Sequence, residues 1–444
     1  MFGYYIKLAA HSLRRNPGIT SLMVLAVALG IAVCVVTLTV HHGMSSNPLW
    51  WKNDRVYAVT LDSWDPEQPA DDKHPDLPPP QLTWRDAEAV TASGIPQHAV
   101  RMFKGYGVIS NDGDGGGVRP ENSIVRVTSA DFFDLFDVPF RYGGGWKAAA
   151  DAAPEPVAVL SSETNERFFG GANSVGRTIR WNDRVYRIVG VLGEWHPAPT
   201  FYDLNNGAFQ DPEAMYVPIG WAPSLELESA GNTNCWKPES IDSFAGFLAS
   251  ECIWIQVWVE LPDAAARTRM QAWLDSYVAG ERRSGRFQRP DNNRLTPIDE
   301  WLRINEVVRD DNRMLVALAF AFLAVCLINT VGLLLAKFLG RAAITGVRRA
   351  LGASRRQVFL QHLAEAGMIA AVGAVLGVAL SALGLHALRV MYASPREGFT
   401  GLMHVNAWSL GVAVAIAVGA ALAAGLYPAW RIGRIAPSVY LKSQ

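Results

Sequence analysis

The chain has 444 residues, a formal net charge of −1 at pH 7, 50% hydrophobic residues and only 18% charged residues. The near-zero charge excludes the domain-wide basic surface of a dedicated nucleic-acid-binding protein, and the high apolar content indicates that part of the chain lies in a membrane. Four windows without Lys, Arg, Asp or Glu reach the roughly 20 residues that span a bilayer: 19–40, 314–336, 366–388 and 408–430. Buried helices of a large soluble core are the less favoured alternative, because such helices usually keep a polar face.

The first segment, residues 1–18, carries apolar side chains at helical spacing with Lys7, Arg14 and Arg15 elsewhere around the wheel. This pattern predicts a helix in the inner membrane interface that ends before Pro17 and Gly18. The span that follows, 19–43, has a longer apolar run than a signal peptide and no clear small-x-small cleavage site. We therefore predict an uncleaved anchor.

Residues 44–312 are predicted to form a mixed α/β domain outside the membrane. Strands are expected at 55–62, 98–110 and 123–128, and Thr83 is expected to N-cap a helix with Asp86 completing a box-like pattern. Asp112 and Asp114 lie in a glycine-rich loop between two strands. An ordinary loop is favoured there over a calcium site, because the later ligands of a calcium loop are absent.

The second half of this domain continues the mixed pattern. A strand within 156–162, a helix ending near Gly170 and a hairpin turning at 182–183 are expected, followed by a loop or mobile insertion over 201–250. A strand at 252–261 and a helix from Asp263 to about Val278 come next. The last helix, 297–313, is predicted to run without a break into the second span.

The four cysteines divide between two environments. Cys34 and Cys326 fall inside predicted spans, whereas Cys235 and Cys252 fall in the external domain, where an oxidising compartment permits a disulfide bond. We favour a bridge between Cys235 and Cys252 over two free thiols. Neither pair has the spacing of a zinc site.

Basic residues set the predicted topology, because Lys and Arg gather on the cytoplasmic side of spans. They cluster before the first span, between the second and third, and after the fourth, so both termini are expected in the cytoplasm and residues 44–312 outside the membrane. The remaining boundaries follow as transmembrane helix 313–338, cytoplasmic loop 339–365, transmembrane helix 366–390, short periplasmic loop 391–407, transmembrane helix 408–430 and cytoplasmic tail 431–444. Gly373 and Gly377 permit close helix approach but carry little weight alone.

Several enzyme classes are disfavoured by missing motifs. The sequence contains no G-x-x-x-x-G-K-[ST], H-E-x-x-H or G-x-S-x-G pattern, and the adjacent His41 and His42 lack metal-ligand spacing on a helix. The four charge-free windows hold no Asp, Glu, Lys, Arg or His except His386, which disfavours an ion-driven transporter. We expect no enzyme activity, metal or cofactor in this chain.

The cytoplasmic loop has an unusual design. It is basic, it is interrupted at Gly352, and Ser354 is placed to N-cap a second helix. Val347 and Leu351 form an apolar edge on the first helix, and Val358, Phe359 and Leu363 form one on the second. A bare topology anchor or a lipid-headgroup patch needs only a few basic residues, so we favour docking to a protein partner.

These segments resemble a known family. "GVRRALGASRRQVFLQHLAEA" resembles the signature of FtsX-like permeases of ABC transporters, and "GLYPAWRIGRIAPSVYLK" resembles their C-terminal end. "LRRNPGITSLMVLAVALGI" is similar to their first span, and "FFGGANSVGRTIRWNDRVYRIVGVL" to the periplasmic core domain of MacB-like macrolide exporters. The resemblance implies a membrane protein of four transmembrane α-helices with a large mixed α/β periplasmic domain inserted between helices 1 and 2.

The resemblance also implies a function. The chain is expected to be an inner-membrane permease of type VII kind, working as a homodimer or with a sister permease. An ABC ATPase would bind ATP and Mg on a second polypeptide, since this chain starts directly at the first span. The coupling helix maps onto Gly346, Val347, Arg348, Arg349, Ala350, Leu351, Gly352, Ala353, Ser354, Arg355, Arg356 and Gln357.

The expected outcome of coupling is mechanotransmission that drives efflux of a drug, peptide or other periplasmic substrate. A periplasmic adaptor, an outer-membrane channel and membrane lipid are the further partners implied, and nucleic acid is not. Three alternatives stay open from the sequence: a lipoprotein-release permease, a signalling subunit that activates an extracellular enzyme, and a membrane receptor unrelated to ABC transporters.

Overall fold

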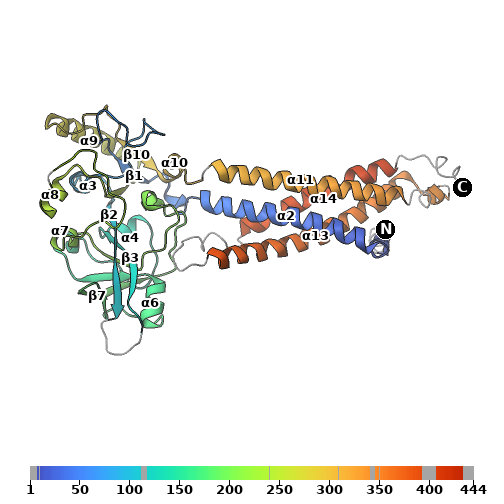
Figure 1. Cartoon of the computed structure of the whole chain (residues 1–444), viewed down its shortest axis with the longest axis horizontal. Helices are drawn as coiled ribbons and strands as arrows, with labels where there is room; N and C mark the ends of the chain where they lie inside the picture. Colours follow the sequence, from blue (N-terminus) through green and yellow to red (C-terminus); the bar gives the residue numbers. More distant parts are fainter. Residues whose placement is uncertain are drawn as a thin grey trace. The chain divides into compact units, whose positions relative to one another are not determined.

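The computed structural model describes residues 8–9, 11–111, 118–239, 241–308, 310–340, 346–349, 351–392 and 407–433. Within these residues the chain forms two compact units, one comprising Ser46–Val307 and the other containing four long helices (Figure 1). The Asp112 and Asp114 loop, the short periplasmic loop after Tyr392 and the tail after Gly433 lie outside the described residues.

Four helices are long and apolar enough to cross a membrane. They are α2 (Pro17–Ser45), α11 (Asp310–Leu339), α13 (Arg355–Tyr392) and α14 (Ala407–Gly433). Each contains one of the predicted apolar windows. A turn at Arg15 and Asn16 separates α2 from the preceding helical residues, one position before the predicted break.

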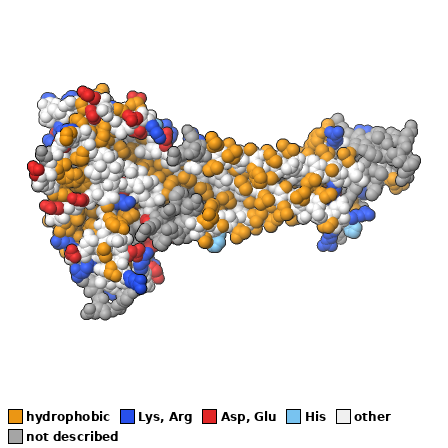
Figure 2. Space-filling model, viewed as in Figure 1, with side chains coloured by type: hydrophobic (Ala, Val, Ile, Leu, Met, Phe, Trp, Pro, Cys, Tyr) orange, Lys and Arg blue, Asp and Glu red, His pale blue; other side chains and the backbone are white. Residues whose placement is uncertain are grey.

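The four helices pack into one bundle in which α2 contacts both α11 and α13, and α13 contacts α14 (Figure 1). Gly373 and Gly377 of α13 face α2, and a Cβ at Gly377 would lie 3.0 Å from the carbonyl oxygen of Ala28. The small-residue pair therefore does set a close helix contact, although the sequence alone gave it little weight. Apolar side chains cover the outer surface of the bundle, as a lipid-facing surface requires (Figure 2).

The other unit is built on one ten-stranded mixed sheet. Nine strands follow the order β10-β1-β9-β2-β3-β8-β5-β7-β4, and β6 pairs with β2 and β7. The β3–β8 and β5–β7 pairs are parallel and the other pairs are antiparallel. The strands are β1 (Val56–Thr60), β2 (His98–Asn111), β3 (Glu121–Thr128), β4 (Phe140–Gly143), β5 (Val157–Leu160), β6 (Thr178–Trp181), β7 (Arg184–Leu192), β8 (Met215–Pro218), β9 (Gln256–Glu260) and β10 (Arg294–Pro297).

Alternate side chains of the strands enter two apolar cores. In β1, Tyr57 and Val59 enter one core, while Val56 and Ala58 enter the other. The helices of this unit lie against the cores or within the loops. They are η1 (Trp50–Lys52), α3 (Trp84–Thr91), α4 (Phe132–Leu135), α5 (Ala149–Ala152), α6 (Ser162–Phe169), η2 (Phe201–Asn206), α7 (Trp221–Ser224), α8 (Phe244–Ala249), α9 (Ala264–Arg283) and α10 (Ile298–Ile304).

The predicted helix ends are confirmed where a polar cap or a glycine marks them. Thr83 and Asp263 accept hydrogen bonds from the backbone N–H groups of Asp86 and Ala266, at 3.1 and 2.7 Å. Gly170 ends α6 in the left-handed conformation with φ +63°. Helix α9 continues to Arg283, five residues beyond the predicted end. The hairpin of β6 and β7 turns at residues 182–183 as expected.

The expected loop or mobile insertion over 201–250 is wrong in part, although the described residues within 207–214 and 225–243 lie outside helices and strands. This segment contains η2, α7 and α8, and its strand β8 lies inside the sheet between β3 and β5. All four residues of β8 are buried. A strand of four residues between Asn- and Gly-rich stretches is too short to give a clear periodic signal, which is why the sequence pattern hides it.

The predicted unbroken helix over 297–313 is also wrong, because α10 ends at Ile304 and α11 begins at Asp310. Glu306 adopts a left-handed φ of +48°, and the N–H groups of Glu306 and Val307 donate to the carbonyls of Arg303 and Leu302. These two bonds form a Schellman stop, which glycine usually provides. Because glutamate occupies the left-handed position that glycine usually takes, the sequence pattern does not mark this helix end.

Candidate functional site

The predicted coupling segment, residues 346–357, is a helix, a turn and a second helix, described at every position except Ala350. Residues 346–349 are helical, and α13 begins at Arg355. Between them Gly352 has φ +101°, and the N–H groups of Gly352 and Ala353 donate to the carbonyls of Arg349 and Arg348. These bonds end the first helix at the glycine, as the sequence predicts.

A reciprocal capping box starts the second helix. The backbone N–H of Gln357 donates to Ser354 Oγ at 3.2 Å, and the backbone N–H of Ser354 donates to Gln357 Oε1 at 2.9 Å. Each residue thus satisfies an N–H group that the helix end leaves unpaired. The box fixes the direction in which α13 leaves the turn, and Ser354 is the cap that the sequence predicts.

The outer surface of the segment combines apolar and cationic side chains. Val347 is 48% exposed and Leu351 is 83% exposed. Arg355 and Arg356 are also exposed, while the Arg348 guanidinium donates to Gln361 Oε1 of α13 at 2.6 Å. Arg348 therefore braces the first helix against the second. Leu351, Arg355 and Arg356 are exposed on the surface.

Buried charges hold the two ends of this loop together. Lys337 near the end of α11 and Glu365 in α13 form an ion pair of 2.6 Å, with side chains 0% and 3% exposed. Ser12 donates a second hydrogen bond to the same carboxylate oxygen, also at 2.6 Å. One carboxylate thus connects α11, α13 and the helical residues before α2. From the sequence, Lys337 counts only as one of the basic residues that set the membrane topology, and Glu365 is not identified as its partner.

Apolar packing surrounds this ion pair. The ring of Phe338 lies 4.3 Å from the ring of His362, and both side chains are buried. Val358 joins Phe338 in a cluster with Met23 of α2 and Leu334 of α11. The inner edge of the first turns of α13 is therefore part of the bundle core, as its apolar side chains predict.

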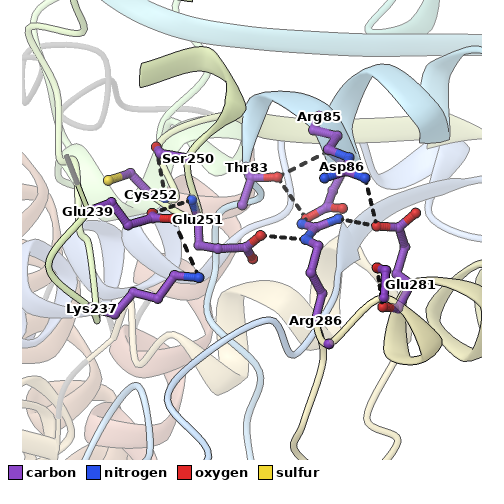
Figure 3. Close-up of polar contacts among 12 residues, drawn as sticks. Thr83, Arg85, Asp86, Lys237, Glu239, Ser250, Glu251, Cys252, Glu281 and Arg286 are labelled. Carbon is purple, nitrogen blue, oxygen red and sulfur yellow. Dashed lines mark hydrogen bonds and ion pairs between the residues drawn. The ribbon is translucent and has the colours of Figure 1, made fainter. Parts of the chain in front are cut away.

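Cys235 and Cys252 are joined by a disulfide bond in the Ser46–Val307 unit. Cys252 is buried, and the residues beside it connect the bridged loop to a network of ion pairs (Figure 3). Glu239 Oε2 accepts the N–H of Glu251 at 2.7 Å, and Lys237 lies 3.4 Å from Glu239. The predicted pair thus belongs to a larger polar cluster.

Arg286 is the centre of that cluster (Figure 3). Its guanidinium contacts Asp86 and Glu281, each at 2.7 Å, and also Glu251. Burial alone would lower the pKa of Arg286, but the carboxylates of Asp86 and Glu251 outweigh it and hold the pKa above its usual value. Asp86 therefore does more than complete the cap of α3, because it also ties α3 to the segment after α9.

A second buried network lies in the segment that the sequence left as a loop. Arg126 of β3 pairs with Asp203 at 2.8 Å and with Glu213, and all three side chains are at most 5% exposed. Tyr202 donates to Glu213 at 2.9 Å, and Gln256 donates to Asp203 at 2.8 Å. Burial raises the pKa of Asp203 even though Arg126 acts in the opposite direction. This network fixes η2 and the start of β8 on the sheet.

The helix bundle contains a cavity of about 560 Å³ between α2, α11 and α13. Its lining is mainly apolar, with Thr37, His41 and Asn312 as polar members, and Leu315 and Leu388 among the apolar ones. His41 thus lies beside a cavity near the end of α2. Among the described residues, no group of three His, Cys, Asp or Glu side chains has the geometry of a metal site.

Comparison with known proteins identifies both parts of the chain. Residues 20–277 match the MacB-like periplasmic core domain, and residues 316–437 match the FtsX-like permease C-terminal domain. The first match alone covers more than half of the chain. The expected resemblance is therefore confirmed for the two domains in the expected order.

Individual relatives are distant. The chain is 24% identical over 389 residues to a macrolide export ATP-binding/permease protein MacB of Rhodospirillum rubrum, which covers 85% of this chain and 52% of that protein. It is 24% identical over 260 residues to the pyoverdine export ATP-binding/permease protein PvdT of Pseudomonas aeruginosa, covering 59% of this chain and 34% of that one. The chain thus spans about half or less of the length of these relatives.

A solved structure gives a similar match. The periplasmic region of MacB from Actinobacillus actinomycetemcomitans matches with 12% sequence identity and a TM-score of 0.36, covering 58% of this chain and 95% of that one. Four apolar helices, the mixed α/β domain between the first and second of them, and the two domain matches agree on one assignment. The chain belongs to the FtsX-like permeases of ABC transporters that carry a MacB-like periplasmic core domain.

Proposed function

We propose that this permease couples ATP hydrolysis by an ABC ATPase subunit to movements of its periplasmic domain, and that these movements drive efflux of a drug, peptide or other periplasmic substrate. In this proposal the ATPase binds ATP and Mg and contacts residues 346–357. Two permeases, either identical or sisters, form the membrane part, with both termini in the cytoplasm. A periplasmic adaptor and an outer-membrane channel complete the export route.

The observation that carries the proposal is the exposed edge of the coupling segment. Leu351 is 83% exposed beside the exposed Arg355 and Arg356. A large aliphatic side chain flanked by arginines is suited to a partner surface with an apolar pocket and acidic rim. The ATPase is the partner that the family supplies on this side of the membrane.

The second support is the rigid mounting of the segment. Its first helix is braced by the Arg348–Gln361 hydrogen bond, and its two ends are held by the buried Lys337–Glu365 pair. A push on residues 346–357 would therefore be transmitted to α11 and α13 together. The family membership sets aside the receptor unrelated to ABC transporters.

The direct test is reconstitution with the ABC ATPase that copurifies with the full chain. Leu351→Ser and the double variant Arg355→Glu/Arg356→Glu should each reduce ATPase binding at least about tenfold, the effect of losing an interface contact worth about 1.4 kcal/mol. Arg15→Glu is the matched control, because Arg15 is exposed on the same predicted side but outside the segment.

Each result has a clear meaning. Loss of ATPase binding in the segment variants, with normal binding by Arg15→Glu, supports the proposal. Unchanged binding by both segment variants would contradict it. ATPase binding without substrate movement in reconstituted vesicles would favour the alternative of a signalling subunit that activates an extracellular enzyme.

The cavity in the bundle favours a second candidate, release of a lipid-linked cargo such as a lipoprotein. Its lining is mainly apolar, and Thr37, His41 and Asn312 supply polar groups, a combination suited to an acyl chain with a polar head. Val40→Trp should fill the cavity and block release of such a cargo. Leu29→Trp is the control, because Leu29 is an exposed α2 residue outside the cavity lining. Equal release by wild type and Val40→Trp would reject this candidate.

A further inference from the structure

Two adjacent tryptophans stand out on the surface of the periplasmic unit. Trp50 is 73% exposed and Trp51 is 50% exposed, and both belong to the short helix η1. Their rings meet edge to face with centroids 5.9 Å apart. This arrangement leaves most of the Trp50 side chain and half of the Trp51 side chain in water, so the two adjacent rings indicate a binding surface.

The tryptophans are mounted rigidly. Lys52 in the same turn is 7% exposed, and its ammonium group contacts Asp137 at 2.8 Å and Glu260 at 3.1 Å. It also donates to the carbonyls of residues 134 and 135. Trp51 Nε1 donates to Asp137 at 2.8 Å. The buried lysine therefore fixes η1 to the sheet and to α4, and the rings are held outward.

The chain itself limits how far this surface can be from the membrane helices. Trp50 follows the last residue of α2, Ser45, by five positions, so it lies at most about 18 Å from the end of that helix. Val307, the last residue of the unit, precedes the first residue of α11 by three positions, a reach of at most about 11 Å.

The chain enters this unit after α2 and leaves it before α11 through residues that lie close together. Leu49 and Val307 belong to the same apolar cluster. The side-chain oxygen of Asn53 accepts hydrogen bonds from Asn47 and from the backbone N–H of Asp299, each at 3.0 Å. The tryptophan pair is thus attached next to the point where the chain enters and leaves two membrane-spanning helices.

We propose that Trp50 and Trp51 bind glycerophospholipid at the headgroup level of the outer leaflet and hold this edge of the periplasmic unit at the bilayer surface. Tryptophan is suited to that depth, because its ring is apolar and its N–H group finds acceptors among headgroup and ester oxygens. The Asp137 bond already occupies Trp51 Nε1, so Trp50, the more exposed ring, enters the lipid further.

The test uses the full chain in nanodiscs, with Cys34 and Cys326 replaced by serine and a bimane label attached at Trp50→Cys. Phosphatidylcholine brominated near the ester end of its acyl chains should quench this label relative to unbrominated lipid. The same label at Tyr106→Cys is the control, because Tyr106 is 53% exposed in β2 of the same unit and has no short connection to a membrane helix. That label should lose no fluorescence.

Other outcomes decide against the proposal. Quenching at position 50 by aqueous iodide as strong as at position 106, with no effect of brominated lipid, would place the pair in water. Protection from both quenchers would mean that a protein, such as a second copy of this chain, covers the pair. The thermal unfolding of Trp50→Cys is the control for folding. Because the exposed Trp50 ring supports little of the fold, this variant should unfold at the wild-type temperature. An absence of lipid quenching then does not arise from misfolding.

Discussion

Glu365 illustrates how a single buried residue can connect several helices. Its carboxylate is 3% exposed and receives the Lys337 ammonium and the Ser12 hydroxyl, both at 2.6 Å. Removing a charge from water costs several kcal/mol unless a partner compensates, so such a pair tolerates loss of both partners better than loss of one.

The first prediction follows from that asymmetry. Lys337→Met and Glu365→Gln should each lower the free energy of unfolding by about 3–5 kcal/mol, because each leaves a buried group without its partner. The double variant Lys337→Met/Glu365→Met should lie within about 1–2 kcal/mol of wild type, because it removes both charges. Thermal unfolding in nanodiscs measures these differences. A double variant as unstable as the sum of the singles would contradict the explanation.

A second ion pair makes the free energy of unfolding depend on pH. Glu163 in α6 and His196 after β7 are 2.8 Å apart. The hydrogen bond to Glu163 raises the pKa of His196 above its usual value. Burial alone would raise the pKa of Glu163, but the hydrogen bond and charge of His196 outweigh it and lower that pKa to about 2.

The sign of the effect follows from linkage. The pair stabilises the fold fully below the unfolded His pKa of about 6.5, and this stabilisation is lost as pH rises through the raised pKa of His196. On the acid side it is lost as pH falls from the unfolded Glu pKa towards about 2. The unfolding-temperature difference between wild type and Glu163→Gln should therefore be largest near pH 5–6 and shrink above pH 7. A difference independent of pH would exclude this ion pair as its cause.

At the scale of elements, what the sequence predicts depends on how directly a residue marks a helix end. Thr83, Gly170, Asp263, Gly352 and Ser354 mark their ends with a cap or a left-handed glycine, and all five are confirmed. The end of α10 escapes prediction, because Glu306 adopts the conformation that glycine usually takes. Strand β8 escapes prediction because its four residues give no clear periodic signal and its support comes from the long-range Arg126 network.

The bridged loop is an element whose stability can be tested. The Cys235–Cys252 bond closes a loop with a sequence separation of 17. A bridge over a loop of that length stabilises a fold by about 3 kcal/mol in the chain-entropy model. Cys235→Ser/Cys252→Ser should therefore lower the free energy of unfolding by about that amount, measured by thermal unfolding in nanodiscs.

The control is chemical. Alkylation of the unreduced protein under denaturing conditions should leave the peptides of both cysteines linked, and reduction should release them with a mass shift. Two alkylated thiols in unreduced native material would refute the bridge. Arg286, which contacts both Glu251 beside Cys252 and Asp86 of α3, would still connect this loop to α3.

At the scale of the whole molecule, composition and hydropathy predict the division into four spans and one inserted domain. They predict it because the bilayer imposes one length and one polarity on every span. They do not predict the order of ten strands, or that Lys337 and Glu365 meet, because these depend on contacts between residues far apart in the chain. Residues 346–357 are predicted in part. Their helices and turn follow from the local sequence, but the buried Lys337–Glu365 pair that connects the ends of the loop does not.

The last prediction concerns the orientation of the whole chain. Basic residues cluster before the first span, between the second and third, and after the fourth, and this one-sided distribution predicts cytoplasmic termini and a cytoplasmic segment 346–357. In intact cells, a membrane-impermeant maleimide should therefore leave Arg15→Cys and Leu351→Cys unlabelled and should label Tyr106→Cys once it has access to the periplasm. All three positions are exposed, so opening the inner membrane should label every variant. Labelling of Leu351→Cys before that step would place residues 346–357 on the periplasmic side, where no cytoplasmic ATPase could reach Arg355 and Arg356.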